Sequence, residues 1–476
     1  MGEKEGITDT ATTSDNPTRS PPMLENEIEN QNQNQPSVFE RFSPIRKRVI
    51  TVVLCYCGLL TPISSTAVLS AIPEVAATFH TTGSIINVSN ALFMAFMALG
   101  PMIWAPISGV FGRRPVFLIS STCLTAFSVG TALAPNLPAF FIFRMLSALQ
   151  GTAVLVVGAV VIGDIYLPTE RGTALGWFLS GTLIGPTIAP LLGGIIVTYT
   201  SWRVIFWTQT GMAGLSTALV VFLLPETIHE KKTQVFDNLT LTQKSTRLLR
   251  LINPTEIVML LFTSPNFMIV GLAVSSFMWN QYSLLTPIRY VLNPRFHLTT
   301  PLQSALFFIA PGAGYLTGTF CGGRWSDYIV KRYMAKRGRR VPEDRLNSAV
   351  ITMAILVPGC MLVYGWAVEK EVGGIPLVVI AMYLQGVTQL LCLPSLNTYC
   401  VDAMENSGKG SLVIAGNYLT RFMFAAASTA VCLPAIQTIG VGWFSTISAL
   451  FISLSAGLVW LVAKFGEGWR LKREGG

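Results

Sequence analysis

Long apolar stretches, separated by polar breaks, dominate this sequence and leave it few ways to fold. Each is close to the roughly 20 residues that an α-helix needs to cross a bilayer. In lipid every backbone polar group must be paired within the protein, so such stretches form helices, whereas a membrane barrel shows alternating segments of about 10 residues. The sequence therefore predicts an all-α membrane protein with twelve transmembrane helices. The predicted spans are 49–72, 86–108, 115–134, 138–164, 173–198, 203–224, 266–290, 302–322, 347–368, 373–398, 411–433 and 437–463.

The positions of Lys and Arg predict how the chain is oriented. Loops on the cytoplasmic side of a membrane carry an excess of these residues. If the N-terminus is cytoplasmic, 27 of the 33 Lys and Arg lie in cytoplasmic segments, so we expect both termini there. The net charge of +9 then reflects topology, not nucleic-acid binding. The exceptions are Arg203, Arg289, Arg295 and Lys370, which face outward, and Arg144 and Arg421, which fall within spans.

Polar segments divide the spans into two halves of six. The longest polar break between spans is 225–263, and the first 40 residues combine polar residues with Pro, which is typical of a disordered tail. No secretory signal peptide precedes the first span. The expected organisation is a disordered cytosolic tail (1–44), an N-terminal six-helix half (45–224), a cytosolic central loop (225–263), a C-terminal six-helix half (264–465) and a cytosolic tail (466–476).

The two halves repeat a pattern of small, basic and acidic residues. Internal repeats of this kind build many secondary transporters and place the substrate site between the halves, near the membrane midplane. At a constant spacing, Gly100, Ser108, Arg113 and Arg114 match Gly318, Ser326, Lys331 and Arg332, and Asp164 is matched approximately by Asp402.

No pattern in the chain predicts an enzyme, a cofactor or a metal ion. The 8 cysteines lie in or at the ends of spans, without metal-ligand spacing to a histidine, so we interpret them as small packing residues. No nucleophile stands at catalytic spacing from a base, and no loop is built to cradle phosphate. We therefore expect no catalytic residue, no cofactor and no metal site.

Three segments carry the most specific signals. Residues 100–115 close the second span and end in Arg113-Arg114-Pro115. Residues 143–151 place Arg144 inside the fourth span, and residues 181–194 fill the fifth span with glycine and proline, which allow close packing and a kink.

These segments resemble signatures of the major facilitator superfamily, and of its drug:proton antiporter branch in particular. The resemblance covers about residues 45–465 and implies a transporter of two six-helix halves. Family members usually carry Asp or Glu where this chain has Gly109, in the motif whose charge pairing locks the outward-facing state; Asp327 keeps the acid in the second half. The resemblance assigns the conformational switch to Gly100, Arg113, Arg114, Asp164, Arg171, Gly185, Pro186 and Asp327.

Arginines inside the membrane point to the substrate. Arg421 lies about 15 Å into the eleventh span and Arg144 about 9 Å from the outer end of the fourth, at 1.5 Å per residue. Arg289 stands near the outer end of the seventh, and no Asp or Glu lies mid-span. A buried charge is costly and marks function by default. A carboxylate substrate supplies the missing partner with bidentate geometry.

Amide side chains near these arginines complete the predicted site. Asn417 lies one helical turn before Arg421, on the same face. Interhelical hydrogen bonding is the alternative role for the amides, and Arg289 has the alternative of extending toward the membrane surface. The predicted substrate-binding residues are Arg144, Arg289, Arg421, Asn417, Gln281 and Gln389.

Residues 287–290, 311–315 and 342–345 resemble a subgroup of fungal transporters that export citrate and related organic acids. With the charge argument, this predicts a plasma-membrane exporter of citrate or a related di- or tricarboxylate, working by alternating access. The inside-negative potential favours expelling an anion by about 2.3 kcal/mol per charge per 100 mV.

Two alternatives belong to other classes. The first is a proton-coupled pump for drugs or secondary metabolites, which would confer resistance to varied compounds. The second is a nutrient sensor that does not transport, which the short C-terminal tail disfavours. The expected partners are a small organic anion, protons if transport is coupled, and membrane lipid. We expect a monomer that binds no nucleic acid.

Overall fold

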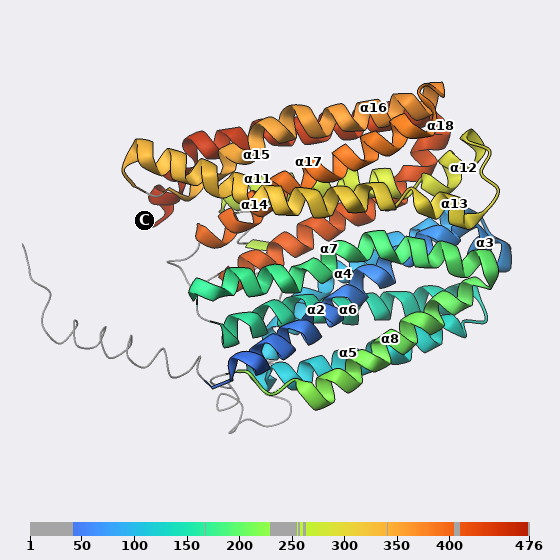
Figure 1. Cartoon of the computed structure of the whole chain (residues 1–476), viewed down its shortest axis with the longest axis horizontal. Coiled ribbons are helices and arrows are strands. Elements are labelled where there is room, and N and C mark those ends of the chain that lie inside the picture. Colours follow the sequence, from blue (N-terminus) through green and yellow to red (C-terminus); the bar gives the residue numbers. More distant parts are fainter. Residues whose placement is uncertain are drawn as a thin grey trace, which may run out of the picture.

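The computed structural model describes residues 41–166, 168–228, 255, 258–259, 263–339, 341–403 and 410–474. Within these ranges the chain is helical and has no β-strand. Long helices run side by side in two groups (Figure 1), one from the N-terminal half and one from the C-terminal half. The predicted 1–44 tail and 225–263 loop lie mostly outside the described residues.

The N-terminal half begins at a helix cap. Ser43 Oγ accepts a hydrogen bond from the amide of Arg46 at 3.4 Å, and Pro44 occupies the first helical position, where its missing N–H costs nothing. The elements of this half are α2 (Pro44–Thr66), the 3-10 turn η1 (Ala67–Ala71), α3 (Ile72–Thr78), α4 (Gly83–Phe111), α5 (Arg113–Ala132), α6 (Leu137–Ile165), α7 (Pro168–Tyr199) and α8 (Trp202–Leu223).

The C-terminal half contains more breaks. The chain leaves helical geometry at Gly440, which divides α18 into two helices. Its elements are α11 (Pro265–Leu285), η3 (Ile288–Leu292), α12 (Asn293–Arg295), α13 (Pro301–Leu306), α14 (Ile309–Arg337), η4 (Pro342–Leu346), α15 (Asn347–Ile351), η5 (Thr352–Leu356), α16 (Val357–Lys370), α17 (Gly374–Asp402) and α18 (Gly410–Glu474). The helix α18 continues through 466–474, where we expected a tail.

Nine of the described helices are long and apolar enough to cross a membrane, and α18 counts once among them although it bends at Gly440. The prediction of an all-α membrane protein is confirmed. The number of twelve crossings stays a prediction.

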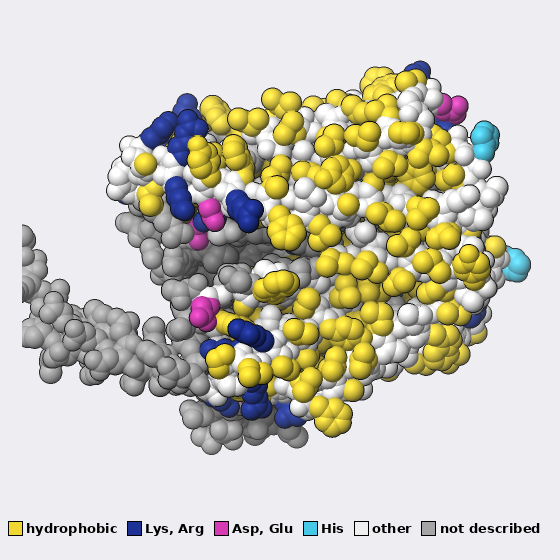
Figure 2. Space-filling view, viewed as in Figure 1, with side chains coloured by type: hydrophobic (Ala, Val, Ile, Leu, Met, Phe, Trp, Pro, Cys, Tyr) yellow, Lys and Arg dark blue, Asp and Glu magenta, His cyan; other side chains and the backbone are white. Residues whose placement is uncertain are grey.

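The two ends of the bundle differ in charge. Most of the Lys and Arg visible in Figure 2 gather at one end, where α2 and α5 begin and α14 ends. We call this the basic end. The opposite end, where α3, η3 and α13 lie (Figure 1), is called the far end. Apolar side chains cover the flank between the two ends, as expected for a surface that faces lipid.

Buried apolar side chains join the halves at the far end. One core cluster contains Val68 and Trp202 of the N-terminal half together with Leu285 and Phe308 of the C-terminal half. Within it, Trp202 packs edge-on against Phe140, with ring centroids 5.7 Å apart. Edge-to-face pairs of this kind contribute beyond the area that they bury.

Candidate functional site

Arg421 of α18 lies beside two stacked aromatic rings and has no ionic partner among the described residues. Its guanidinium carbon is 5.2 Å from the ring centroids of both Tyr418 and Phe422. No described residue forms a hydrogen bond or an ion pair with it, and its Nε is buried without a partner. The hydroxyl of Tyr282 on α11 lies close enough to interact with it electrostatically. Arg421 is thus a cation with open hydrogen-bonding capacity, as predicted.

Glutamines form a chain of hydrogen bonds between α11 and α17. Gln389 Nε2 donates to Gln281 Oε1 at 3.1 Å, and Gln385 Nε2 donates to Gln389 Oε1 at 2.9 Å. The sequence placed Gln281 and Gln389 in the site, and the structure brings them together. Because each amide satisfies the next, this chain of hydrogen bonds holds the two helices together, and Gln385 Oε1 is buried without a partner.

Asn417 does not bond to Arg421. Its Nδ2 donates to Asn397 Oδ1 on α17 at 3.3 Å, and its own Oδ1 has no partner. The buried hydroxyl of Tyr315 on α14 also lacks a partner. Helices α14, α17 and α18 of the C-terminal half thus each carry an unsatisfied polar atom that a ligand or water could meet.

Arg144 is enclosed in the N-terminal half. Its guanidinium lies over the rings of Phe93, Phe140 and Phe206, at 4.8 to 5.7 Å from their centroids. One nitrogen, Nη2, donates to Asn90 Oδ1 at 2.8 Å. The side chain is 1% exposed, so a substrate cannot reach it in this conformation. Its assignment to the substrate site remains a prediction.

Arg289 has a carboxylate partner, which we did not expect. It forms an ion pair with Glu74, which belongs to α3 in the other half, and its Nη1 donates to Ser304 Oγ at 3.3 Å. The guanidinium is almost buried. This pairing was neither of the two roles predicted for Arg289, substrate binding and extension toward the membrane surface, because nothing in the order of residues shows that α3 and η3 meet. In this conformation Arg289 instead joins the halves at the far end.

Other contacts close the far end as well. The amide of Leu302 on α13 donates to Thr198 Oγ1 on α7 at 3.1 Å. Two glycines allow close approach between the halves, since a Cβ on Gly312 would overlap Thr187 and a Cβ on Gly83 would overlap the ring of Tyr290. The far end is therefore tightly packed.

An ion pair organises the basic end of the N-terminal half. Arg113 Nε donates to Asp164 Oδ2 at 3.1 Å, and its Nη1 donates to Ser108 Oγ at 3.1 Å. Glu226, which follows α8, accepts the backbone N–H of Arg113 at 2.9 Å. A carboxylate at a helix N-terminus satisfies a free amide and favours the positive end of the helix dipole. Two predicted switch residues, Arg113 and Asp164, thus meet directly.

The C-terminal half repeats this arrangement with a different arginine. Arg345 lies 3.5 Å from Asp402 and 3.6 Å from Asp327, and it donates to Ser326 Oγ at 3.3 Å. The constant spacing in the sequence had matched Arg113 with Lys331, which is exposed. The alignment was wrong for this residue because α14 continues to Arg337, so the chain returns to Ser326 only at η4.

The remaining predicted switch residues serve packing. A Cβ on Gly100 would overlap Thr152 of α6, and one on Gly185, which precedes Pro186 in α7, would overlap Pro62 of α2. Arg114 Nη2 donates to the carbonyl of Val221 at 2.8 Å. The side chain of Arg171 lies outside the described part of the structure. By contrast, the Cβ position of Gly109 has no neighbouring atom within 4 Å.

Sequence reasoning missed three contributors. Tyr282 and Tyr315 looked like ordinary aromatic residues of apolar spans. Glu226 follows the sixth span in a Leu-Pro-Glu-Thr segment, and its position just outside a helix was the available signal for a cap. Among the described residues, no group of three His, Cys, Asp or Glu side chains is placed to hold a metal ion.

Comparison with known proteins agrees with this architecture. The chain is 25% identical to the MFS antiporter QDR3 of Candida albicans, over 87% of this chain and 77% of that protein. It is 26% identical to the efflux pump radE of Floropilus chiversii, over 90% of this chain and 82% of that protein. A bacterial homolog of the human lysosomal transporter Spinster shares the fold with a TM-score of 0.65 at 14% identity, covering 90% of this chain and 99% of that one.

These relatives do not support the predicted resemblance to exporters of organic acids. Their names, antiporter and efflux pump, correspond to the antiporter branch. The family model of this fold matches residues 54–424, which span most of both halves. The chain is a membrane transporter, not an enzyme, and it belongs to the Major Facilitator Superfamily.

Proposed function

We propose that this chain exports small organic compounds of the drug or secondary-metabolite class across the plasma membrane by alternating access, in exchange for protons. The names of the two fungal relatives support export and exchange. This function is preferred over export of an organic acid because those relatives are named as an antiporter and an efflux pump.

The environment of Arg421 carries the proposal for the substrate. A cation beside the stacked rings of Tyr418 and Phe422, which also interacts electrostatically with Tyr282, suits a compound with a flat apolar part and an anionic or strongly accepting group. The rings bind the flat part, while the open Nε of Arg421 binds the anion.

The contacts at the far end support a defined conformational state. If the basic end faces the cytosol, as the distribution of Lys and Arg favours, this structure is closed toward the outside. Release of substrate then requires that Arg289 leave Glu74 and that α7 separate from α13 and α14. Arg113–Asp164 and Arg345–Asp402 lie within one half each and hold the basic end of their own half together.

Export of citrate or a related carboxylate is the second candidate. The observation that favours it is the charge balance: no Asp or Glu lies in the middle of a described span, whereas Arg421 does. Such a site attracts anions and repels cationic drugs.

The test is expression in a yeast strain that lacks its own efflux pumps. Citrate, itaconate, malate and succinate are measured in the medium, and growth is measured with a panel of antifungal compounds. Resistance without acid release supports the first proposal, and selective release of one acid supports the second. Arg421→Ala should lower either activity at least about tenfold, because a lost hydrogen bond to a charged group costs roughly 1.5–3 kcal/mol.

Arg295→Ala is the matched control. Arg295 is a surface arginine of the same half, paired with Glu371 at 3.2 Å, and its loss should leave export unchanged. Arg421→Lys should recover only part of the activity, since an ammonium lacks the planar fork of the guanidinium. If Arg421→Ala exports normally at equal abundance in the membrane, the proposed site is wrong.

A further inference from the structure

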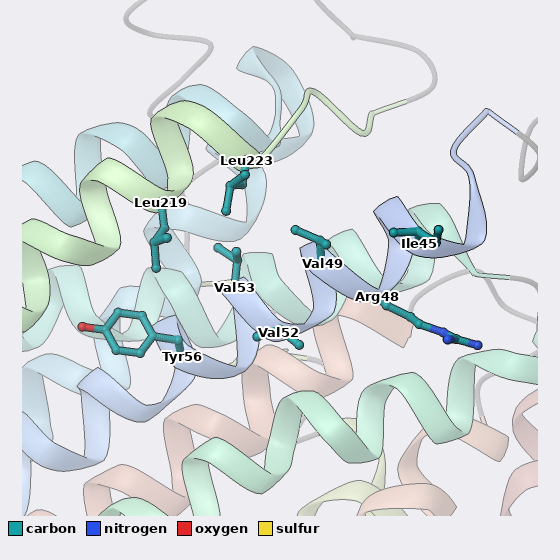
Figure 3. Close-up of a pocket in the computed structure, with 8 residues that line it drawn as sticks. All are labelled: Ile45, Arg48, Val49, Val52, Val53, Tyr56, Leu219 and Leu223. Carbon is teal, nitrogen blue, oxygen red and sulfur yellow. The ribbon is translucent and has the colours of Figure 1, made fainter.

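A groove on the outer surface of the N-terminal half is lined by apolar side chains and carries a positive charge at one end, which complements an anionic phospholipid. It encloses about 500 Å³ between the first turns of α2 and the last turns of α8, at the basic end (Figure 3). Ile45, Val49 and Val53 of α2 and Leu219 and Leu223 of α8 form its apolar walls. It lies away from the Arg421 site and within one half of the protein.

The deep end of the groove offers no free polar atom. Tyr56 lies there, and its hydroxyl already donates to the carbonyl of Met212 at 2.9 Å. A polar ligand would therefore lose its own hydrogen bonds on entering, whereas a hydrocarbon chain loses none. Because the wall residues Ile45 and Val49 are exposed on the surface of the bundle, lipid is the solvent that meets this groove.

Arg48 lines the other end of the groove and brings a free positive charge. It is exposed, and no described residue forms a hydrogen bond or an ion pair with it. Its neighbours are engaged differently: Arg46 lies over the ring of Phe42 at 5.6 Å, and Lys47 lies over the ring of Tyr166 at 5.7 Å. From Arg48 to Tyr56 the helix rises about 12 Å. The charge of Arg48 and the apolar deep end of the groove at Tyr56 therefore lie at different depths in the membrane.

We propose that this groove binds one anionic phospholipid, with an acyl chain between α2 and α8 and the headgroup phosphate on Arg48. Charge complementarity selects the anionic class, because basic clusters next to a membrane-crossing helix attract anionic headgroups. Arg41, Arg46 and Lys47 strengthen the positive field at the same level. The binding does not depend on which compound the protein transports, so it can be tested independently of the proposed function.

The experiment uses the purified full-length protein in nanodiscs that contain phosphatidylserine with a photoreactive acyl chain. After illumination, the labelled peptides are identified by mass spectrometry. We expect labelling within 45–56 and 219–223. Arg48→Gln should lower it at least about fivefold, while Arg46→Gln, which removes an equal charge outside the groove, should leave it within about twofold.

A second variant tests the groove itself. Val52 is 68% exposed in its wall, so Val52→Trp fills the space without disturbing the core, and it should abolish labelling while Arg48 is intact. Equal labelling by photoreactive phosphatidylcholine, or no labelling of these two segments, would overturn the proposal. A severalfold rise in labelling after deletion of residues 1–40 would also overturn it, because the N-terminal segment would then be the native occupant.

Discussion

At the scale of single residues, the arginines in and near the spans have three different environments. Arg144 lies among rings and donates to one amide, with Nε and Nη1 buried without a partner; Arg289 pairs with Glu74; and Arg421 forms no hydrogen bond or ion pair with any described residue. Arg144 is enclosed, whereas Arg421 is only partly buried, so an anion or a strong acceptor can reach it. This access, together with the lack of a described partner, makes Arg421 the best candidate to contact substrate.

Glu74→Gln should loosen the far end, since it removes the charge that pairs with Arg289. A weakening of about 1.4 kcal/mol changes the population of open molecules tenfold. The reporter is Ala305→Cys, a buried residue of α13 that lies against Gly194 of the other half, in a background without the exposed Cys321. Labelling by a membrane-impermeant maleimide should become about tenfold faster.

The control for this measurement is Glu371→Gln. Glu371 pairs with Arg295 inside the C-terminal half, so its loss should not open the far end. Equal labelling rates in Glu74→Gln and in the parent would show that the ion pair does not hold the halves together.

The sequence identified which of these residues carry charge within the membrane, but not their partners. Arg421 stays without a described partner, as predicted. The pairing of Arg289 was not predictable, because Glu74 is more than two hundred residues away and approaches only when the halves dock; its role in substrate binding stays a prediction. Partner choice of this kind is a tertiary property, and no periodicity in the chain encodes it.

At the scale of elements, two helices start in the same unusual way. Gly112 before α5 has φ 107° and ψ 165°, and Gly440 within α18 has φ 83° and ψ 168°, a region that is essentially reserved for glycine. After each glycine, a distant carboxylate accepts the first backbone N–H at 2.9 Å: Glu226 for Arg113 and Glu369 for Val441. The chain thus reverses at one residue and begins the next helix with a cap.

Gly440→Ala should destabilise the protein by roughly 1–3 kcal/mol, because alanine is strained at this φ and ψ and its Cβ would press on Glu369. We expect the apparent Tm of the purified protein to fall by a few degrees. Gly457→Ala in the same helix is the control, since its Cβ meets no atom within 4 Å, and it should raise or preserve Tm. If the Gly440→Ala and Gly457→Ala proteins have the same Tm, alanine is not strained at position 440.

Element positions were largely predictable, whereas these caps were not. The described helices coincide within a few residues with most of the predicted spans, since length and hydropathy determine them. The alignment of Arg113 with Lys331 failed because one half extends α14 before turning. A repeat in sequence preserves spacing only while both copies keep the same helix lengths.

At the scale of the whole molecule, charge is distributed along one axis. The basic end carries Arg113, Arg345 and Arg470 in ion pairs and Arg48 without one, whereas the far end contributes mainly Arg289 and Arg295. This asymmetry supports a cytoplasmic basic end, since positive residues are retained on that side during insertion.

Epitope tags at the two termini test this orientation. In intact cells, neither tag should react with antibody, and both should react after the membrane is permeabilised. A tag inserted after His297, in the segment that links α12 and α13 at the far end, serves as the positive control and should react in intact cells. Reaction of either terminal tag in intact cells would reverse the orientation and with it the direction of proposed export.

Gly109 has an evolutionary consequence. Its Cβ position has no neighbouring atom within 4 Å, so no contact there excludes a side chain. Every glycine codon becomes an aspartate or glutamate codon when its second base changes from G to A. The acid typical of the family is therefore one nucleotide substitution away, and it would not require compensating changes nearby. If the acid improved the transport cycle of this protein, selection could restore it in a single step; its absence then reflects the working cycle, not a lack of room.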